Sequence, residues 1–380
     1  MPQTKHDPGT IGALTDMSFE ALFQFGWNEH FAQSFQPFLE NDYLPGRVSF
    51  QNQHLYRVYT EQGELLVEAT GKLRYDAASP EDLPAVGDWV ALRFRPQEDR
   101  ARIQAVLPRQ SKFARKAAGA KTEMQIVGAN VDTIFLVTSL NQDFNPRRVE
   151  RYLTTIWDSG ARPVIVLSKS DLCSDAAEIG ERVAMLQEAA HNVPIHAVSA
   201  KTQQGLDDLL QYCRTGQTIA LIGMSGVGKS TLINHLLGFA RQKVKDVRGH
   251  DERGQHTTRH RELILLPQGG LVLDTPGMRE LQLWDAESGI GTTFEDIEAI
   301  ATHCFFSDCQ HQSEPRCAVN TAVNDGTLAV ERLENYNKLQ KELHHLVLRQ
   351  DDLARKQEQK KWKKLSKLAE QRARTKRKGL

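Results

Sequence analysis

The feature that most constrains the fold is a glycine-rich segment at residues 223–230, which reads Gly-Met-Ser-Gly-Val-Gly-Lys-Ser. It matches the pattern G-x-x-x-x-G-K-[ST], follows the apolar run Ile219–Ile222 and precedes the helical pattern Thr231–Leu237. Glycines let the backbone curl so that successive N–H groups face phosphate oxygens, and the dipole of the following helix adds to the attraction. We expect Lys229 to reach the β- and γ-phosphates and Ser230 to ligate Mg²⁺. The expected contacts of this loop with a nucleotide are Gly223, Met224, Ser225, Gly226, Val227, Gly228, Lys229, Ser230 and Thr231.

A second signal follows about 45 residues later, where the apolar run Leu271–Leu273 ends in Asp274-Thr-Pro-Gly277. Alone, D-x-P-G is a common turn. After a phosphate loop, a carboxylate at the end of such a strand is expected to hold the metal ion, so we place Asp274 near Mg²⁺. The N–H group of Gly277 is expected to reach the γ-phosphate.

Two further segments suggest which base is bound. Ser168-Lys-Ser-Asp171 and Ser199-Ala-Lys201 each follow an apolar run, and they resemble the N-K-x-D and S-A-K elements that read guanine. A carboxylate accepts hydrogen bonds from both guanine N1–H and the 2-amino group, and adenine offers neither in that geometry. Asp171 therefore favours GTP over ATP, although Ser168 stands where Asn is usual and S-K-S-D alone could be an exposed turn. The expected base contacts are Ser168, Lys169, Asp171, Ser199, Ala200 and Lys201.

The order of these motifs predicts the topology. Ordinary GTPases carry the phosphate loop first, whereas here both base-reading segments precede it, so we expect a circularly permuted GTPase domain. Apolar runs alternate with helical patterns from Val131 to Leu273, which predicts a mostly parallel sheet with helices on both faces. The same strands can pair in space when a new linker joins the old termini. The chain after Gly277 then enters the C-terminal module directly, so movement there could be transmitted to it.

The N-terminal part has a different pattern. Residues 18–39 carry apolar positions at helical spacing, which predicts one helix with Ser18 as N-cap. Five short β-rich runs between residues 46 and 106 predict a small OB-fold β-barrel, followed by a basic connector at 109–116. The barrel could bind nucleic acid or act as a spacer. The predicted domains are 1–44 (helical extension), 45–112 (OB fold), 113–290 (GTPase), 291–350 (zinc-binding) and 351–380 (basic helix or tail).

Three of the five cysteines cluster with a histidine as Cys304-x4-Cys309-x-His311-x5-Cys317. This Cys₃His set is the composition of a closed structural Zn²⁺ site. His303 is an alternative ligand that fits the spacing less well. A module this small is expected to depend on the metal to fold. Cys173 and Cys213 stand alone and are expected to be inert, buried or half-buried thiols.

The net charge of zero hides an uneven distribution. Residues 355–380 hold 12 Lys or Arg and 2 acidic residues, a net of +10, so residues 1–354 carry −10. Such a run is usually a solvated helix or tail, but beside a zinc module and a barrel it favours binding of rRNA phosphates, with Trp362 stacking on a base or simply packing. The stripe Leu333, Tyr336, Leu339, Leu343 and Leu346 predicts helix packing against the zinc module. We find no signal peptide or membrane span and expect a cytoplasmic monomer without a membrane partner.

Taken together, the motifs over about residues 44–340 resemble the RsgA/YjeQ family of circularly permuted GTPases, ribosome small subunit-dependent GTPase A. The resemblance implies a GTPase in late maturation of the small (30S) ribosomal subunit that binds 16S-type rRNA and is stimulated by the subunit. It also implies that Gly254-Gln-His-Thr-Thr258 is the switch, in which Thr257 or Thr258 ligates Mg²⁺ in the GTP state.

The residue that orients the attacking water is less obvious. Many GTPases place Gln directly after D-x-x-G, and this chain has Met278, whose side chain cannot polarise water. His256 in the switch is our catalytic candidate, together with Lys229, Thr257 and Thr258. The alternative is that His256 binds an RNA phosphate or only fills the loop.

The motifs leave three function classes. The first is a GTP-hydrolysing assembly factor, and the second is a GTP-gated RNA-binding adaptor in which hydrolysis is incidental. A P-loop ATPase or kinase is a distant third, because Asp171 argues against adenine.

Overall fold

The computed structural model describes residues 19–40, 43–52, 54–94, 101–116, 124–140, 144–190, 192–238, 261–274, 287–312 and 314–343. These residues form two compact units, one built from the described residues up to 274 and one from residue 287 onward. The five domain boundaries expected from the sequence remain predictions.

The N-terminal part of the larger unit is a five-stranded barrel, as predicted. Its strands pair in the order β1-β2-β3-β5-β4, and a further pairing of β4 with β1 closes it. A short helix, α2, lies between β3 and β4. One valine from each of four strands and Ile103 of the fifth fill the interior (Val48, Val58, Val67, Val90). The bounds are β1 (Tyr43–Asn52), β2 (Leu55–Thr60), β3 (Gly63–Ala69), α2 (Gly71–Asp76), β4 (Trp89–Arg93) and β5 (Arg102–Val106).

The single helix predicted for residues 18–39 is wrong. The chain forms a 3₁₀ helix, η1 (Glu20–Phe25), and then α1 (Glu29–Leu39). Gly26 adopts φ 86° between them, in the left-handed region that ends a helix, and Asn28 caps α1 by accepting a hydrogen bond from the N–H of Phe31. Phe31 and Phe35 of α1 pack with Trp89 of the barrel in one core cluster. Ser18 lies outside the described residues.

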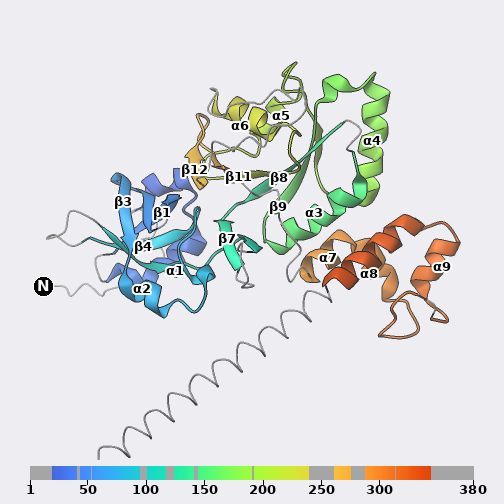
Figure 1. Ribbon diagram of the computed structural model, residues 1–380, viewed down its shortest axis with the longest axis horizontal. Coiled ribbons are helices and arrows are strands. Elements are labelled where there is room, and N and C mark those ends of the chain that lie inside the picture. The colour runs from blue at the N-terminus through green and yellow to red at the C-terminus, as the bar shows by residue number, and fades with distance from the viewer. Residues whose placement is uncertain are drawn as a thin grey trace, which may run out of the picture. The chain divides into compact units, whose positions relative to one another are not determined.

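The second part of the larger unit is the predicted α/β domain (Figure 1). Its strands run in the order β10-β9-β8-β11-β13-β12, and every pair is parallel except β12 with β13. Helices α3 and α4 cover one face of this sheet, and α5 and α6 cover the other (Figure 1). The bounds are β8 (Thr133–Ser139), α3 (Pro146–Asp158), β9 (Arg162–Ser168), α4 (Ala176–Ala189), β10 (Ile195–Ala197), α5 (Asp207–Leu210), β11 (Thr218–Ile222), α6 (Lys229–Leu237), β12 (Arg261–Leu265) and β13 (Leu271–Asp274).

Three strands were not expected. The basic connector at 109–116 contains a strand, β6 (Lys112–Lys116), which pairs with β7 (Met124–Ala129). Strand β12 follows the predicted switch and pairs with β1 of the barrel, which joins barrel and α/β sheet into one sheet. Arg57 supports this junction through an ion pair with Glu262 at 3.0 Å.

A buried arginine also ties the parts of the larger unit together. Arg47 is 2% exposed, and its guanidinium donates to the carbonyl oxygens of Phe25, Gly87 and Asn130. Burial lowers the pKa of Arg47 to about 10. The N-terminal segment, the barrel and the α/β domain thus share one donor.

The smaller unit is helical, as expected for the C-terminal module. It contains α7 (Glu287–Thr293), α8 (Glu295–Ala301), α9 (Ala318–Asn324) and a helical run at 330–343. Its core includes Phe294 and the predicted stripe of Leu333, Tyr336, Leu339 and Leu343, which confirms that the stripe packs within this unit. Leu346 lies outside the described residues.

Candidate nucleotide site and metal centre

The segment 223–230 forms a tight loop between β11 and α6. Every residue of β11 is buried, so the start of the loop is anchored in the core. Gly223 has φ 138°, and a Cβ there would lie 2.1 Å from the carbonyl oxygen of Val137, so only glycine fits. Gly228 caps α6 with φ 100°. The Lys229 ammonium donates to the carbonyl oxygens of Gly223 and Met224 at 2.7 and 2.6 Å, which holds its charge at the mouth of the loop.

The two segments predicted to read guanine come together at the carboxyl ends of neighbouring strands β9 and β10. Asp171 and Lys169 line a cavity of about 400 Å³ with Ala200 and Lys201, and the far wall comes from the phosphate loop and α6 (Val227, Gly228, Thr231, Leu232). The Ser199 hydroxyl donates to Oδ1 of Asp171 at 2.6 Å, which fixes the orientation of the carboxylate. Leu172, 60% exposed, also lines the cavity. No motif pointed to Leu172, and its only sequence signal is an apolar side chain directly after the S-K-S-D segment.

Ser168 connects the base-reading segment to the phosphate loop, although it stands where Asn is usual. Its hydroxyl donates to the carbonyl oxygen of Val227 in the phosphate loop at 2.6 Å, and Ser168 is only 4% exposed. Base loop and phosphate loop are therefore directly connected.

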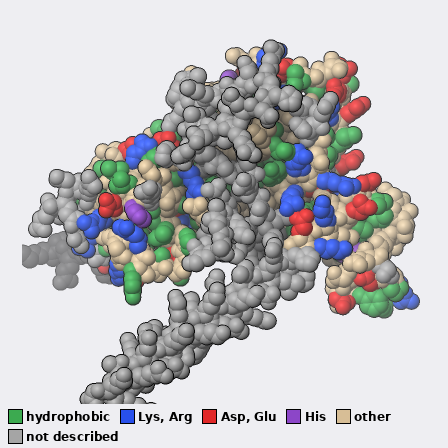
Figure 2. Space-filling view, viewed as in Figure 1, with side chains coloured by type: hydrophobic (Ala, Val, Ile, Leu, Met, Phe, Trp, Pro, Cys, Tyr) green, Lys and Arg blue, Asp and Glu red, His purple; other side chains and the backbone are tan. Residues whose placement is uncertain are grey.

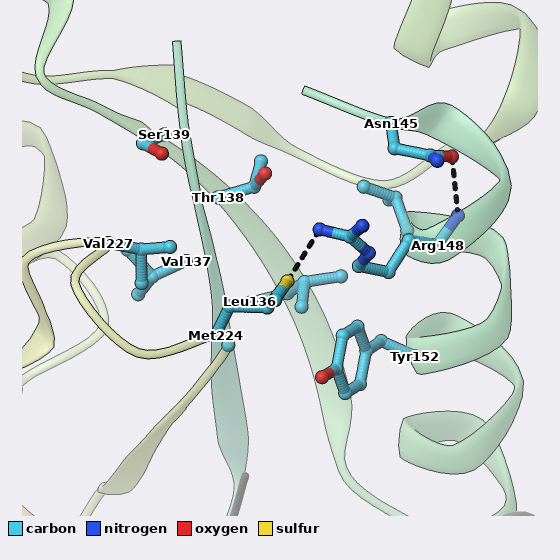
Figure 3. A pocket seen from close by; sticks show the side chains of 11 residues that line it. Leu136, Val137, Thr138, Ser139, Asn145, Arg148, Tyr152, Met224 and Val227 are labelled. Carbon is cyan, nitrogen blue, oxygen red and sulfur yellow. Dashed lines mark hydrogen bonds between the residues drawn. The ribbon is translucent and has the colours of Figure 1, made fainter. Parts of the chain in front are cut away.

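A side chain that the motifs did not predict lies on the other flank of the phosphate loop. Arg148 extends from the first turn of α3 and its guanidinium donates to the sulfur of Met224, next to Tyr152 and Thr138 (Figure 3). Asn145 caps α3 by accepting from the N–H of Arg148 at 3.2 Å, which fixes where this turn starts. The contact places a positive charge beside the loop.

Four predicted site residues lie outside the described residues: His256, Thr257, Thr258 and Gly277. Met278, which stands where the water-orienting Gln is usual, also lies outside them. Asp274 is the last residue of β13, and it is partly buried. Because β13 pairs in parallel with β11, Asp274 and the phosphate loop lie at the same carboxyl edge of the sheet. That Asp274 holds Mg²⁺ stays a prediction.

The metal cluster predicted from the sequence is assembled in the smaller unit. One ligand atom from each of Cys304, Cys309, His311 and Cys317 lies within 4.8 Å of all the others. Sγ of Cys304 is 3.9 Å from Sγ of Cys317, and His311 Nδ1 is 3.7 and 3.4 Å from these two sulfurs. Zn–S bonds of about 2.3 Å and Zn–N bonds of about 2.0–2.1 Å at tetrahedral angles require ligand separations of roughly 3.5–3.8 Å. The residues present therefore fit a closed tetrahedral metal site, and His303 is not among them.

The protonation of the cluster also suits a metal. Burial lowers the pKa of His311, so the imidazole is neutral and can offer a lone pair. Burial opposes ionisation of Cys304, but hydrogen bonds from the N–H groups of Val319 and Ala318 and with the thiols of Cys317 and Cys309 together lower the pKa of this thiol. Burial, with the nearby sulfurs of Cys317 and Cys304, raises the pKa of Cys309 to about 11. Without a metal, ionisation of one thiol therefore opposes ionisation of the next. A bound divalent cation would stabilise all three thiolates together.

Known proteins are similar to this chain in sequence. A family model described as RsgA GTPase matches residues 106–284. The chain is 44% identical over 353 residues to the small ribosomal subunit biogenesis GTPase RsgA of Opitutus terrae, covering 90% of this chain and 95% of the relative. It is 50% identical over 306 residues to RsgA 2 of Lactiplantibacillus plantarum, covering 80% of this chain and 85% of the relative.

Solved structures show the same fold. The crystal structure of YjeQ from Thermotoga maritima aligns with a TM-score of 0.60 at 30% identity, over 79% of this chain and 98% of that one. YloQ, described as a circularly permuted GTPase, aligns with a TM-score of 0.61 at 25% identity, over 81% and 97%.

A second family model, described as ABC transporter, matches residues 206–375. That span contains the phosphate loop, a motif that P-loop ATPases and GTPases share.

Among the described residues, no helix is both long and apolar enough to cross a lipid bilayer.

Proposed function

Because this chain belongs to the RsgA GTPase family and is a GTPase, we propose that it acts in the late maturation of the small (30S) ribosomal subunit. We further propose that it works in the cytoplasm, binds 16S-type rRNA, and hydrolyses GTP faster when bound to the subunit. The observation that carries the proposal is the 44% identity, over 95% of its length, to a relative named for small ribosomal subunit biogenesis.

In this proposal the base cavity selects GTP. Asp171, oriented by Ser199, accepts from guanine N1–H and the 2-amino group, and the N–H of Ala200 donates to O6. Lys169 and Lys201 pack along the base. The hydrogen bond from Ser168 to Val227 supports the proposal, because it links recognition of the base to the loop that holds the phosphates. ATP offers neither donor to Asp171 and is excluded.

The phosphate side carries the reaction. Backbone N–H groups of residues 223–231 surround the phosphates, and Lys229 leaves its two carbonyl partners to bind the β- and γ-phosphates. Ser230 and Asp274 would hold Mg²⁺, with Thr257 or Thr258 as a further ligand in the GTP state, and the N–H of Gly277 would donate to the γ-phosphate. Bound Mg²⁺ neutralises charge that develops on the phosphate oxygens. Water attacks the γ-phosphorus and gives up a proton to the released phosphate or to solvent, the bond to the β-phosphate oxygen breaks, and GDP and phosphate leave.

The chain lacks the glutamine that usually orients the attacking water. Met278 cannot polarise water, and we assign this role to His256. A catalytic set that lacks the usual Gln gives slow intrinsic turnover, which is why we expect the small subunit to stimulate the reaction.

The Cys₃His cluster is proposed as a structural Zn²⁺ site. All four positions are filled by Cys304, Cys309, His311 and Cys317, so no open position remains for a substrate. Bound zinc would link both sides of the loop between α8 and α9, because its four ligands lie along that loop. The twelve basic residues of 355–380 are proposed to contact rRNA phosphates.

Single-turnover GTP hydrolysis, with and without purified small subunits, tests the proposal. Stimulation of many-fold is expected from an assembly GTPase. Equal rates would favour the rival, an RNA-binding adaptor that GTP only switches between conformations. His256→Ala measured in both conditions tests the catalytic assignment, and unchanged rates would reject it.

A further inference from the structure

Two large aromatic side chains lie on the surface of the loop that carries the metal ligands. Phe305 is 61% exposed and Phe306 is 41% exposed, directly after the ligand Cys304. The other phenylalanine of this unit, Phe294, is fully buried. Figure 2 shows hydrophobic side chains at the surface of this unit. Single exposed apolar residues are common on protein surfaces. Two adjacent rings that stay exposed although the unit has a hydrophobic core suggest a binding surface.

The rings have a defined geometry. Their centroids are 5.0 Å apart and their planes meet at 87°, an edge-to-face pair. The Arg316 guanidinium carbon lies 5.0 Å from the centroid of Phe305, as a cation over the ring. The Phe305 N–H donates to the carbonyl oxygen of Arg316 at 3.4 Å, so the two sides of the loop are joined. Each of the three residues is next or second to a cluster cysteine, which restrains it when the metal is bound.

We propose that Phe305, Phe306 and Arg316 form a platform on which unpaired bases of single-stranded RNA stack. This inference rests on the proposed function, since it names the part of the RNA that this surface takes. Every base has a flat π-face, so aromatic and guanidinium groups bind bases by stacking without reading sequence. Single-stranded RNA leaves these faces open, whereas a duplex keeps them stacked inside the helix.

Charge disfavours phosphate contacts at this surface. The described residues of the smaller unit contain four Lys or Arg and ten Asp or Glu, a net charge of −6. Asp308 is exposed within the same loop, and the Glu314 carboxylate accepts from the N–H groups of Gln310 and Gln312. An acidic surface repels the RNA backbone, so in this proposal the platform contributes affinity through stacking and not through phosphate contacts. The basic residues 355–380 follow in the same chain and can supply the phosphate contacts.

This division predicts two separable effects. Loss of a stacking ring lowers affinity without releasing fewer counterions, so the salt dependence of binding stays unchanged. Loss of the basic residues flattens the salt dependence. Full-length, zinc-loaded Phe305→Ala and Arg316→Ala proteins are titrated with a labelled oligouridine and with an RNA duplex at several salt concentrations. Val330→Ala is the matched control, because Val330 is 51% exposed in the same unit and distant in sequence from the cluster.

For Phe305→Ala we expect the affinity for oligouridine to fall by roughly 5- to 150-fold, the range for one lost base–aromatic stack. Affinity for the duplex and the salt slope are expected to match wild type, and Phe305→Trp to bind oligouridine at least as well as wild type. Zinc content is measured for each variant. If Phe305→Ala loses zinc, Phe305→Leu keeps the apolar bulk and removes the π-face, so it replaces that variant.

Oligouridine binding by Phe305→Ala or Phe305→Leu that equals the Val330→Ala control would overturn the platform. Loss of binding to small subunits with oligouridine binding intact would also overturn it, because the partner would then be a ribosomal protein. Stimulation of wild-type GTPase by small subunits is measured in parallel. If small subunits stimulate the wild-type GTPase but the variants bind oligouridine like wild type, the proposed function stands and only the platform is rejected. Unstimulated wild type rejects the proposed function itself.

Discussion

The hydrogen bond from Ser199 to Asp171 allows a quantitative test of base recognition. Ser199 is fully buried, and its hydroxyl donates to the carboxylate at 2.6 Å while accepting from the N–H of Thr202 at 3.1 Å. Ser199→Ala removes a hydrogen bond to a charged group, which contributes about 1.5–3 kcal/mol. If the carboxylate then loses its orientation toward guanine, the Kd for GDP rises by roughly 10- to 150-fold, since about 1.4 kcal/mol corresponds to a factor of ten.

The assay is a fluorescence titration with a labelled GDP, followed by competition with GTP, XTP and ATP. Ser170→Ala is the matched control, because Ser170 is also buried and is adjacent to Asp171. Asp171→Asn is expected to exchange guanine for xanthine preference, because its amide donates where xanthine has a carbonyl. A Kd for GDP in Ser199→Ala that equals the Ser170→Ala value would refute the reasoning, because the hydroxyl would then not position the carboxylate.

Four further outcomes are expected. Gly223→Ala should abolish GDP binding and lower the melting temperature in calorimetry, since its Cβ would lie 2.1 Å from a carbonyl oxygen; normal binding would contradict the loop geometry. Cys309→Ser, or a chelator, should release zinc and remove the near-UV circular dichroism of the smaller unit, while GTP affinity is kept; a folded unit without metal would contradict the structural role. Cys213 should resist a thiol reagent at pH 8 until the protein unfolds, because burial raises its pKa to about 12, and rapid labelling of the folded protein would refute this. Between pH 9 and that value the thiol of the unfolded chain ionises while the folded one stays protonated, so the free energy of unfolding falls as the pH rises. Deleting residues 355–380 should weaken rRNA binding and flatten its salt dependence with GTP affinity intact, and lost GTP affinity would reject that division.

The chemistry of both centres could be predicted from the sequence because each depends on residue types at short spacing. The loop 223–230 needs glycines where the backbone curls, and the set Cys304, Cys309, His311 and Cys317 spans 14 residues. Five barrel strands and the parallel sheet were also predictable, since apolar runs and turn residues mark them locally. The permutation follows from motif order alone.

Other features depend on contacts between distant segments. Periodicity over 18–39 predicts one helix, but the left-handed Gly26 and the Asn28 cap divide it so that α1 can pack against Trp89. Strand β12 is only five residues long and is recognisable as a strand because β13 and β1 flank it.

Sequence by itself determined the nucleotide chemistry, the metal ligands and the order of the motifs, because residue type and spacing carry that information. Tertiary structure decided how these parts are connected. Ser168 reaches Val227, 59 residues away, and Arg47 joins three segments through backbone carbonyls that have no signature in the sequence. The exposure of Phe305 and Phe306 was likewise decided by the fold, since a phenylalanine in a sequence is expected to be buried until packing leaves it outside the core.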